Sequence, residues 1–248
     1  MNVDAIDIDN LTVRFESITA VNGLSLRIRW GELFGLLGPN GAGKTTTVNV
    51  LSTLLKPTEG TVKVGGHDVT QDAAQIREMI GLCPQQPAFY PFLTGRENIE
   101  LFGTLHSVPK DELKKRTEDL IRKIGMEDHA NRRASEYSGG MVRRVSTAMA
   151  LIHNPRVALL DEPTVAMDPV SRRAVWDFIK ELKNNGKAIV LTTHYMEEAA
   201  ELCDRVAIID EGKLVALGTP KELTEKYGAE NLEAVFIQLT GKKLKEEV

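Results

Sequence analysis

Apolar and polar residues alternate along the first thirty positions of the chain. The apolar members of this pattern are Val3, Ile6, Ile8, Leu11, Val13, Phe15, Leu24, Leu26 and Ile28. Successive side chains of a strand point to opposite faces, so a spacing of two predicts half-buried antiparallel strands. We therefore predict an antiparallel β layer at the N-terminus.

A different pattern follows. The continuous apolar run Leu33–Leu37 is typical of a central strand buried on both faces. After a glycine-rich loop, a helix is predicted with Val48, Leu51, Leu54 and Leu55 on one side, ended by Pro57. Residues 61–64 predict a further strand, and the turn at 65–66 ends it.

From about residue 93 to 154 the pattern is helical. Thr94 and Glu97 have the spacing of a capping box, Pro109 is placed to start a second helix, and Gly125 to close it. Asn154 and Pro155 then break the chain.

Strands and helices alternate beyond this break. The predicted strands are 157–160, 188–192 and 206–209, and the predicted helices are 175–182 and 196–202. This alternation indicates an α/β fold with a mostly parallel sheet. We expect a core made of residues 1–84 and 155–220, a helical subdomain at 85–154 and a helical or tail segment at 221–248, with 242–247 as a solvated tail.

Composition narrows the class of protein. Charged residues make up 27% and hydrophobic ones 42%, as in water-soluble globular proteins. The net charge of −4 argues against a nucleic-acid partner.

Cys83 and Cys203 suggest neither a zinc site nor a disulfide framework, which fits a reducing cytosol. The acidic start does not resemble a signal peptide, and no stretch has the roughly 18 uncharged apolar residues of a spanning helix. Work at a membrane would therefore require docking onto another chain.

The segment from Gly38 to Thr45 matches GxxxxGK[ST] in full, which favours a phosphate-binding loop over a glycine-rich turn with an incidental lysine. Glycines let backbone N–H groups approach phosphates, and the following helix adds its positive end. Lys44 can reach the β- and γ-phosphates and the Thr45 hydroxyl can hold Mg²⁺. The residues expected to bind ATP here are Gly38, Pro39, Asn40, Gly41, Ala42, Gly43, Lys44, Thr45 and Thr46.

Two acids end a predicted apolar strand at 157–160. Asp161 is expected to assist Mg²⁺ coordination, and Glu162 to act as general base or to polarise the attacking water. An ordinary acidic turn after a strand is the alternative, which the phosphate loop upstream makes much weaker.

With these motifs, the sequence resembles the ATP-binding cassette (ABC) family over essentially its whole length. The run Tyr137-Ser138-Gly139-Gly140-Met141 is similar to the family signature LSGGQ, with Tyr for Leu and Met for Gln. Ser138 can cap the helix that follows, and Gly139 and Gly140 expose N–H groups at its start. The resemblance implies a P-loop NTPase core of the RecA-like type. It also implies a head-to-tail dimer in which these residues face the γ-phosphate held by the other protomer.

Further positions look like known elements of the family. Gln85 resembles the glutamine that senses Mg²⁺ and the water, although the adjacent Gln86 leaves the assignment open by one residue. His194 resembles the switch histidine at the γ-phosphate, and Asp168 the acid that signals between protomers. Phe15 falls where an aromatic stacks on adenine. A surface glutamine, a structural histidine, an exposed Asp-Pro turn and a core phenylalanine are the respective alternatives.

Four aromatic residues closely follow Gln85. They are Phe89, Tyr90, Phe92 and Phe102. Clustered aromatics commonly mark interfaces, so we expect them to receive a short helix from a membrane partner. The alternative is that they form the core of the helical subdomain.

The resemblance implies an ATPase that drives transport through integral membrane permease subunits from the cytoplasmic face of the membrane. The working dimer is a homodimer or a heterodimer with a similar ATPase. Tyr137 and Met141 look like those of drug-export members similar to daunorubicin-resistance ATPases, which favours export; the substrate is not encoded in this chain. A soluble ABC protein of cluster assembly, translation or DNA repair is the second hypothesis. A nucleotide-binding regulator is disfavoured because Glu162 and His194 are both present.

Overall fold

The computed structural model describes residues 4–241, so Val3 and the predicted tail at 242–247 lie outside the described residues. The chain forms two compact units. Unit 1 combines Met1–Arg77 with Ala188–Val248, and unit 2 is Glu78–Lys187. The subdomain boundaries expected at residues 85 and 154 stay a prediction.

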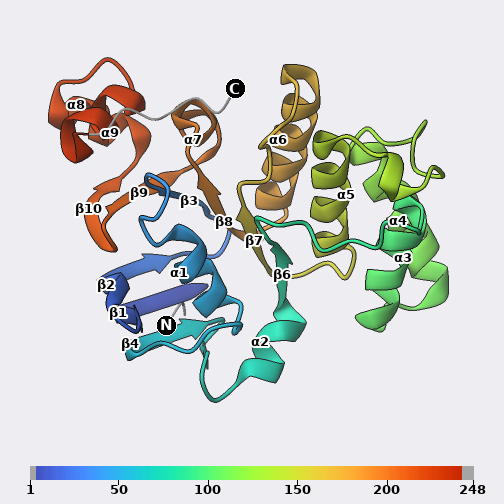
Figure 1. Cartoon of the computed structure of the whole chain (residues 1–248), viewed down its shortest axis with the longest axis horizontal. Coiled ribbons are helices and arrows are strands. Elements are labelled where there is room, and N and C mark those ends of the chain that lie inside the picture. The colour runs from blue at the N-terminus through green and yellow to red at the C-terminus, as the bar shows by residue number, and fades with distance from the viewer. Residues whose placement is uncertain (1–3, 242–248) are drawn as a thin grey trace. The chain divides into compact units, whose positions relative to one another are not determined.

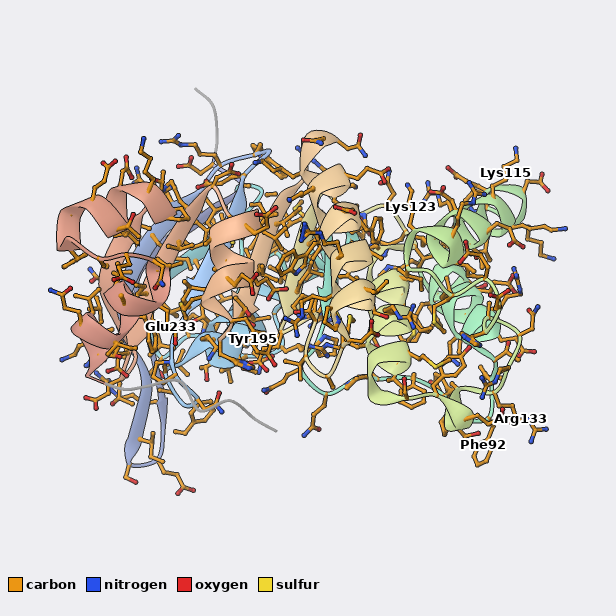
Figure 2. All side chains as sticks on the ribbon, turned by 90° about the horizontal axis from the view of Figure 1, so that it is seen from above. Phe92, Lys115, Lys123, Arg133, Tyr195 and Glu233 are labelled. Carbon is orange, nitrogen blue, oxygen red and sulfur yellow. The ribbon has the colours of Figure 1, made fainter. Side chains whose placement is uncertain are left out.

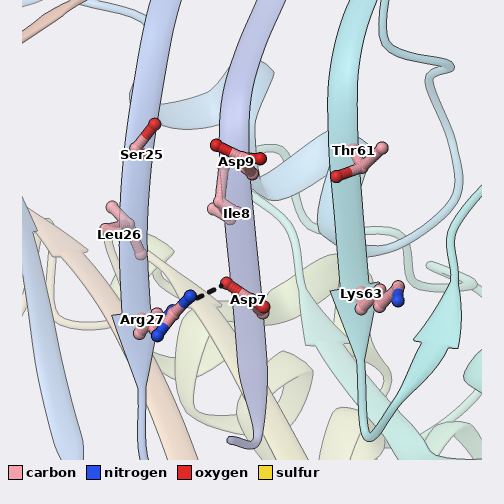
Figure 3. Close-up of a pocket in the computed structure, with 8 residues that line it drawn as sticks. All are labelled: Asp7, Ile8, Asp9, Ser25, Leu26, Arg27, Thr61 and Lys63. Atoms are coloured by element: carbon pink, nitrogen blue, oxygen red, sulfur yellow. Dashed lines mark hydrogen bonds and ion pairs between the residues drawn. The ribbon is translucent and has the colours of Figure 1, made fainter.

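The predicted antiparallel layer is present in unit 1. Its strand order is β2 (Ile18–Ile28), β1 (Ile6–Phe15), β4 (Glu59–Val64) and β5 (His67–Asp68). Ile8 and Leu26 face one side and are buried, while polar side chains occupy the other side of β1, β2 and β4 (Figure 3). There, Arg27 Nε donates to Asp7 Oδ1 over 3.1 Å. The apolar residues of the alternating sequence pattern thus lie on the buried face of the layer, and the polar residues lie on the other face.

A second group of strands in unit 1 is mixed and mostly parallel. β3 (Leu33–Leu37) pairs in parallel with β8 (Ala188–Thr193) and with β9 (Arg205–Asp210), and β10 (Lys213–Gly218) is antiparallel to β9. Leu37 lies opposite both Thr193 and Ile208. The residues that follow β3 and β8 therefore emerge at the same edge.

The helices of unit 1 are α1 (Lys44–Leu51), α7 (Met196–Leu202), α8 (Pro220–Tyr227) and α9 (Leu232–Thr240). α2 (Ala73–Met79) carries the chain from one unit to the other. α1 lies over the antiparallel layer (Figure 1). The prediction that α1 continues to Leu55 was wrong, because Thr53 adopts a left-handed φ of 63° and the Leu54 side chain is 65% exposed.

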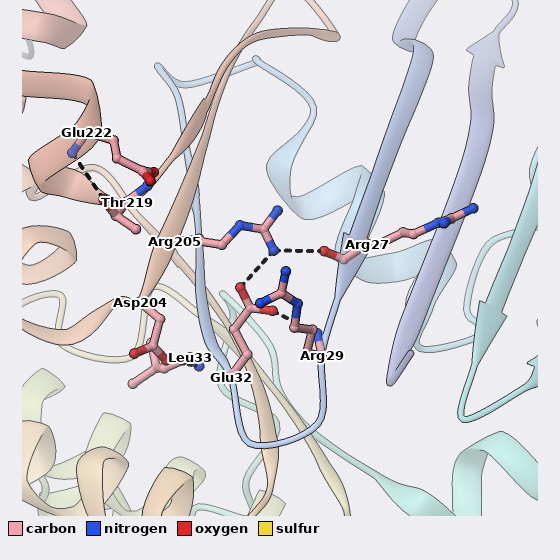
Figure 4. A network of polar contacts seen from close by, with 8 residues as sticks. All are labelled: Arg27, Arg29, Glu32, Leu33, Asp204, Arg205, Thr219 and Glu222. Carbon is pink, nitrogen blue, oxygen red and sulfur yellow. Dashed lines mark hydrogen bonds and ion pairs between the residues drawn. The ribbon is translucent and has the colours of Figure 1, made fainter. Parts of the chain in front are cut away.

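A polar network fixes the start of β3 (Figure 4). Arg205 Nη1 lies 2.9 Å from Glu32 Oε1 and also donates to the Arg27 carbonyl. Asp204 Oδ2 accepts from the Leu33 N–H at 2.9 Å. Because Glu32 is buried, its contact with Arg205 offsets the cost of removing its charge from water. The network holds the β3 and β9 starts in register.

Unit 2 contains two parallel strands, β6 (Ile80–Cys83) and β7 (Val157–Asp161). Its helices are α3 (Gly95–Leu105), α4 (Lys110–Lys123), a short 3₁₀ helix (Ala134–Glu136), α5 (Gly139–Leu151) and α6 (Pro169–Asn184). The predicted capping box is confirmed, since the Thr94 and Glu97 side chains each accept from the other's backbone N–H. β6 was not predicted from the sequence.

Lys123 joins α4 to α6 within unit 2 (Figure 2). Its ammonium lies 2.7 Å from a carboxylate oxygen of Asp119 and 2.7 Å from one of Glu181. Burial lowers the pKa of Lys123, but the hydrogen bonds and charges of Asp119 and Glu181 together outweigh burial, so the pKa is raised.

Two further features concern the described residues only. Cys83 and Cys203 are buried free thiols, and burial raises the pKa of Cys83. No helix in the described part of the chain is long and apolar enough to span a bilayer.

Two histidines stack in unit 2. The centroids of the His106 and His153 rings lie 3.8 Å apart, and the angle between the ring planes is 5°. His153 Nε2 lies 2.9 Å from the Ile80 carbonyl oxygen. His153 Nδ1 is buried with no hydrogen-bond partner, so a proton there would have no acceptor. Burial, and then repulsion from His106, lowers the pKa of His153 from 6.5 to about 4.

We predict that this histidine makes the protein less stable as the pH falls. Between pH 6.5 and about 4 the unfolded chain binds a proton that folded His153 does not, so stability is complete above pH 6.5 and decreases below it. Allowing for partial solvent screening, the loss should be about 1–2 kcal/mol. Urea unfolding at pH 7.5 and 4.5 should show a smaller pH effect in His153→Gln. A pH effect in His153→Gln equal to that of the unsubstituted protein would contradict this assignment.

Candidate functional site

The predicted phosphate loop lies in unit 1 between β3 and α1. Gly43 has a φ of 101°, and a Cβ there would lie 2.4 Å from the Ala20 carbonyl oxygen. A Cβ at Gly38 would lie 2.4 Å from the Ile209 carbonyl oxygen. Both positions therefore require glycine, for backbone angle or for space. The glycines of the motif let the loop pack closely against β9 and the β2 backbone.

α1 begins directly after this loop with no side-chain cap. The first N–H groups of an uncapped helix, together with the positive end of its dipole, favour an anion. Lys44 is 5% exposed, and its Nζ donates to the carbonyls of Gly38 at 2.7 Å and Pro39 at 3.1 Å. Thr45 and Thr46 are half-buried in the first turn of the helix. The loop has the geometry of a phosphate cradle.

Two other predicted residues lie in unit 1. His194 directly follows Thr193, which is paired with the last residue of β3, so His194 and Gly38 leave the sheet at the same edge. The His194 ring contacts the Tyr195 ring at 4.2 Å. Phe15 ends β1 and is 46% exposed, so it is not a core residue.

Unit 2 brings the predicted acids together with the predicted glutamine. Asp161 is the last residue of β7 and Glu162 comes one residue beyond it, and both are buried. Because β6 and β7 are parallel neighbours, Gln85 emerges beside them, and its Nε2 donates to Glu162 Oε2 over 3.4 Å. Glu162 has a φ of 52°, a left-handed conformation that is uncommon outside glycine.

Sequence reasoning missed one residue of this cluster, Arg143 of α5. It is 4% exposed, and its guanidinium donates to the backbone carbonyls of Pro84, Gln85, Asp161 and Glu162. The only sequence signal is its place five residues after Ser138, where a basic residue of an amphipathic helix suggests a solvated side chain.

The signature-like segment starts α5 as predicted. Ser138 is the N-cap, and its Oγ accepts from the Met141 N–H at 3.3 Å. Gly139 is exposed and Gly140 is buried. The Tyr137 hydroxyl donates to the His129 carbonyl at 2.7 Å and accepts from the Gly95 N–H at 3.2 Å. Tyrosine at this position therefore ties α5 to the start of α3.

Asp168 caps α6. Its Oδ1 accepts from the N–H groups of Val170 and Ser171, each at 3.0 Å. The contacts with Ser171 lower the pKa of Asp168. The exposed Asp168-Pro169 pair at the start of α6 thus has a structural role as a helix cap.

The predicted metal donors are a hydroxyl of Thr45, a carboxylate of Asp161 and an amide oxygen of Gln85. Such oxygen donors suit Mg²⁺, which also keeps waters and phosphate oxygens as ligands. Within residues 4–241, no cluster of three or more His, Cys, Asp or Glu side chains could hold a metal by itself. The oxygen donors of Thr45, Asp161 and Gln85 are of the chemical kind that Mg²⁺ binds.

The strand, glycine loop and uncapped helix of unit 1 define a P-loop nucleotide-binding protein. The family model described as ABC transporter matches residues 21–165. The daunorubicin resistance ATP-binding protein DrrA3 of Streptomyces coeruleorubidus is 43% identical over 94% of this chain and 73% of its own length. The linearmycin resistance ATP-binding protein LnrL of Bacillus subtilis (strain 168) is 39% identical over the same shares.

A solved structure is also similar. The dimeric ATP-binding cassette MJ0796, in a post-hydrolysis state bound to ADP and Pi, has a TM-score of 0.80 and 29% identity, covering 86% of this chain and 98% of that one. The chain belongs to the ABC transporter family. It is an ATP-binding subunit of that family and an ATPase, which confirms the predicted fold class and activity.

Two glycines of the loop allow a matched test of its packing. Gly41 and Gly43 both have positive φ, of 80° and 101°, but only a Cβ at Gly43 meets backbone. We predict that Gly41→Ala lowers the free energy of unfolding by about 1–2 kcal/mol, the cost of left-handed backbone alone. Gly43→Ala should cost about 3 kcal/mol or more, because the clash adds to it. Urea unfolding measures both, and equal losses would contradict the close approach to Ala20.

Proposed function

We propose that this protein is the ATP-hydrolysing subunit of a drug-type exporter, with Glu162 as the general base that activates water. The observation that carries the proposal is the buried Glu162 carboxylate at the end of β7 with the Gln85 amide 3.4 Å away. In a chain that also carries a phosphate loop, such a carboxylate and amide have the chemistry to orient a water for attack on a phosphate.

The other predicted residues take supporting roles in this proposal. Lys44 and the loop amides hold the β- and γ-phosphates, and Thr45, Gln85 and Asp161 supply oxygen donors to Mg²⁺. The metal would neutralise charge that develops on the phosphates. His194 contacts the γ-phosphate, and the exposed face of Phe15 stacks on adenine.

ATP is proposed to close a dimer, because Ser138 and Gly139 are exposed at the start of α5, and the first N–H groups of a helix suit an anion. The γ-phosphate held by a second chain would be that anion, and Asp168 would signal between the chains. A homodimer or a heterodimer with a similar ATPase satisfies this scheme. Closure favoured by ATP and lost after hydrolysis would supply the differential affinity that drives the cycle.

The Glu162→Gln variant tests the proposed base. It keeps size and hydrogen bonding but cannot accept a proton, so we expect kcat for ATP hydrolysis to fall at least ~10²-fold. ATP binding should persist and the ATP-bound dimer should become long-lived by size-exclusion chromatography. Glu16→Gln, in an exposed turn, serves as the control and should hydrolyse ATP normally. Unchanged turnover in Glu162→Gln would remove this residue from the mechanism.

The proposed docking surface is the aromatic cluster of unit 2, defined as Phe89, Tyr90, Phe92 and Phe102. None of the four is buried, and Tyr90 and Phe92 are 54% and 83% exposed. Figure 2 shows the Phe92 side chain projecting away from the ribbon. Exposed aromatics of this kind commonly form the centre of an interface.

One buried residue holds the backbone of this surface. Asn98 is 0% exposed; its Oδ1 accepts from the Tyr90 N–H at 2.7 Å, and its Nδ2 donates to the carbonyls of Tyr90 and Thr94. The aromatic side chains are thus free to face outward while their backbone stays fixed. We propose that they receive a helix of an integral membrane permease at the cytoplasmic face of the membrane.

Alanine substitutions separate this role from a core role. Tyr90→Ala with Phe92→Ala should reduce co-purification with the permease at least ~10-fold, as loss of interface aromatics does, and leave the melting temperature and basal ATPase activity unchanged. Leu105→Ala, which removes another exposed apolar side chain of unit 2, should have no effect. The permease for this assay would be sought among integral membrane proteins encoded next to this gene. Unfolding of the double variant without specific loss of binding would favour the core role.

The direction of transport is proposed from resemblance to the two resistance proteins, both of which are named as resistance ATP-binding proteins. Tyr137 and Met141 of the signature-like segment agree with it. Transport assays in vesicles with the assembled permease are the direct measurement of direction.

A further inference from the structure

Arg143 is a buried cation of unit 2 that does not figure in the mechanism above. Its Nε donates to the Glu162 carbonyl at 2.8 Å, its Nη1 to Pro84 at 2.5 Å and Gln85 at 2.9 Å, and its Nη2 to Asp161 and, at 2.7 Å, Glu162. A guanidinium has five N–H donors in a planar fork. These five contacts use the whole donor set.

The acceptors come from two separate chain segments. Pro84 and Gln85 follow β6, and Asp161 and Glu162 are at the end of β7. The guanidinium therefore fixes the two segments to each other through their backbones, next to the place where the Gln85 amide meets the Glu162 carboxylate. A change in α5 that moves Arg143 would move both segments.

Glu162 needs such support. Its φ of 52° is a left-handed conformation that costs energy in a residue with a Cβ and persists only where surrounding contacts determine it. Two of the five donors of Arg143 meet the carbonyl of this residue, and a third meets the carbonyl just before it. The direction of the Glu162 side chain depends on this backbone.

We propose that Arg143 is a positioning residue for hydrolysis, which holds the Glu162 backbone and Gln85 in the geometry that activates water. Arg143 is on α5, the helix that Ser138 caps, so it also links the signature-like segment to the proposed base. This inference rests on the proposed function of Glu162. It adds a residue that acts through Glu162 and makes no contact with nucleotide.

Arg144 supplies a matched control. It is the next residue of α5, and its Nη1 donates to the carbonyls of Ile124 at 3.1 Å and Gly125 at 2.7 Å, which belong to the turn after α4. Replacing either arginine by methionine removes a guanidinium that binds backbone carbonyls from the same helix. Of the two arginines, Arg143 donates to the carbonyls of Glu162 and Gln85, whereas Arg144 donates to those of Ile124 and Gly125.

In the full chain, Arg143→Met should lower kcat about 10²-fold, the effect of a misplaced catalytic group, while the Kd for ATP changes less than about threefold. Arg144→Met should keep kcat within about threefold. In a Glu162→Gln background, Arg143→Met should lower the residual kcat less than about threefold, because its effect passes through Glu162.

If Arg143→Met does not fold, Arg143→Lys is the second variant, with folding checked by circular dichroism. One ammonium has three donors and cannot span four carbonyls, so kcat should fall about 10-fold with ATP binding retained. Full activity in Arg143→Lys, equal losses at Arg143 and Arg144, or loss of ATP affinity together with kcat would overturn the inference. A Glu162→Gln variant with normal turnover would instead show that the proposed function itself is wrong.

Discussion

Two buried cations bonded to backbone carbonyls are the constraint on which the functional residues depend. A charge taken out of water is stable only where hydrogen bonds replace its hydration. Lys44 in unit 1 meets this requirement through Gly38 and Pro39, and Arg143 in unit 2 meets it through two strand ends. In each case the acceptors belong to a loop that carries proposed site residues, so the conformation of the loop and the position of the cation depend on each other.

Parallel strands explain why such loops can be gathered at one edge. In unit 1, β3 and β8 end in register, and in unit 2, β6 and β7 do so. Residues just beyond adjacent strand ends become neighbours although they are far apart in sequence, as Gln85 and Glu162 show. Apart from Asp161, the last residue of β7, these parallel strands contribute no side chain to the proposed site; they set the spacing at which the groups emerge.

Local patterns in the sequence were sufficient for β1–β4 and β7–β9, the capping box at Thr94 and the phosphate loop, since each depends on residues close in the chain. Three features depend on tertiary contacts and were missed or misplaced. β6 is short and contains Gly81, whose absent Cβ makes room for the Ala150 carbonyl. α1 ends at Leu51, well before Pro57, and Arg143 is buried only because carbonyls from distant segments surround it.

Asn98 anchors residues 90–94 through their backbone atoms alone, so the conformation of this segment does not depend on its exposed side chains. An amide inside the unit sets the path of the chain, and the outward aromatic groups take no part in it. If this surface binds the permease as proposed, substitutions of those aromatic groups would change the partner that is bound without altering the fold of the ATPase. In the same way, paralogous subunits could keep one set of residues for ATP hydrolysis and differ in the exposed side chains that bind their transporters.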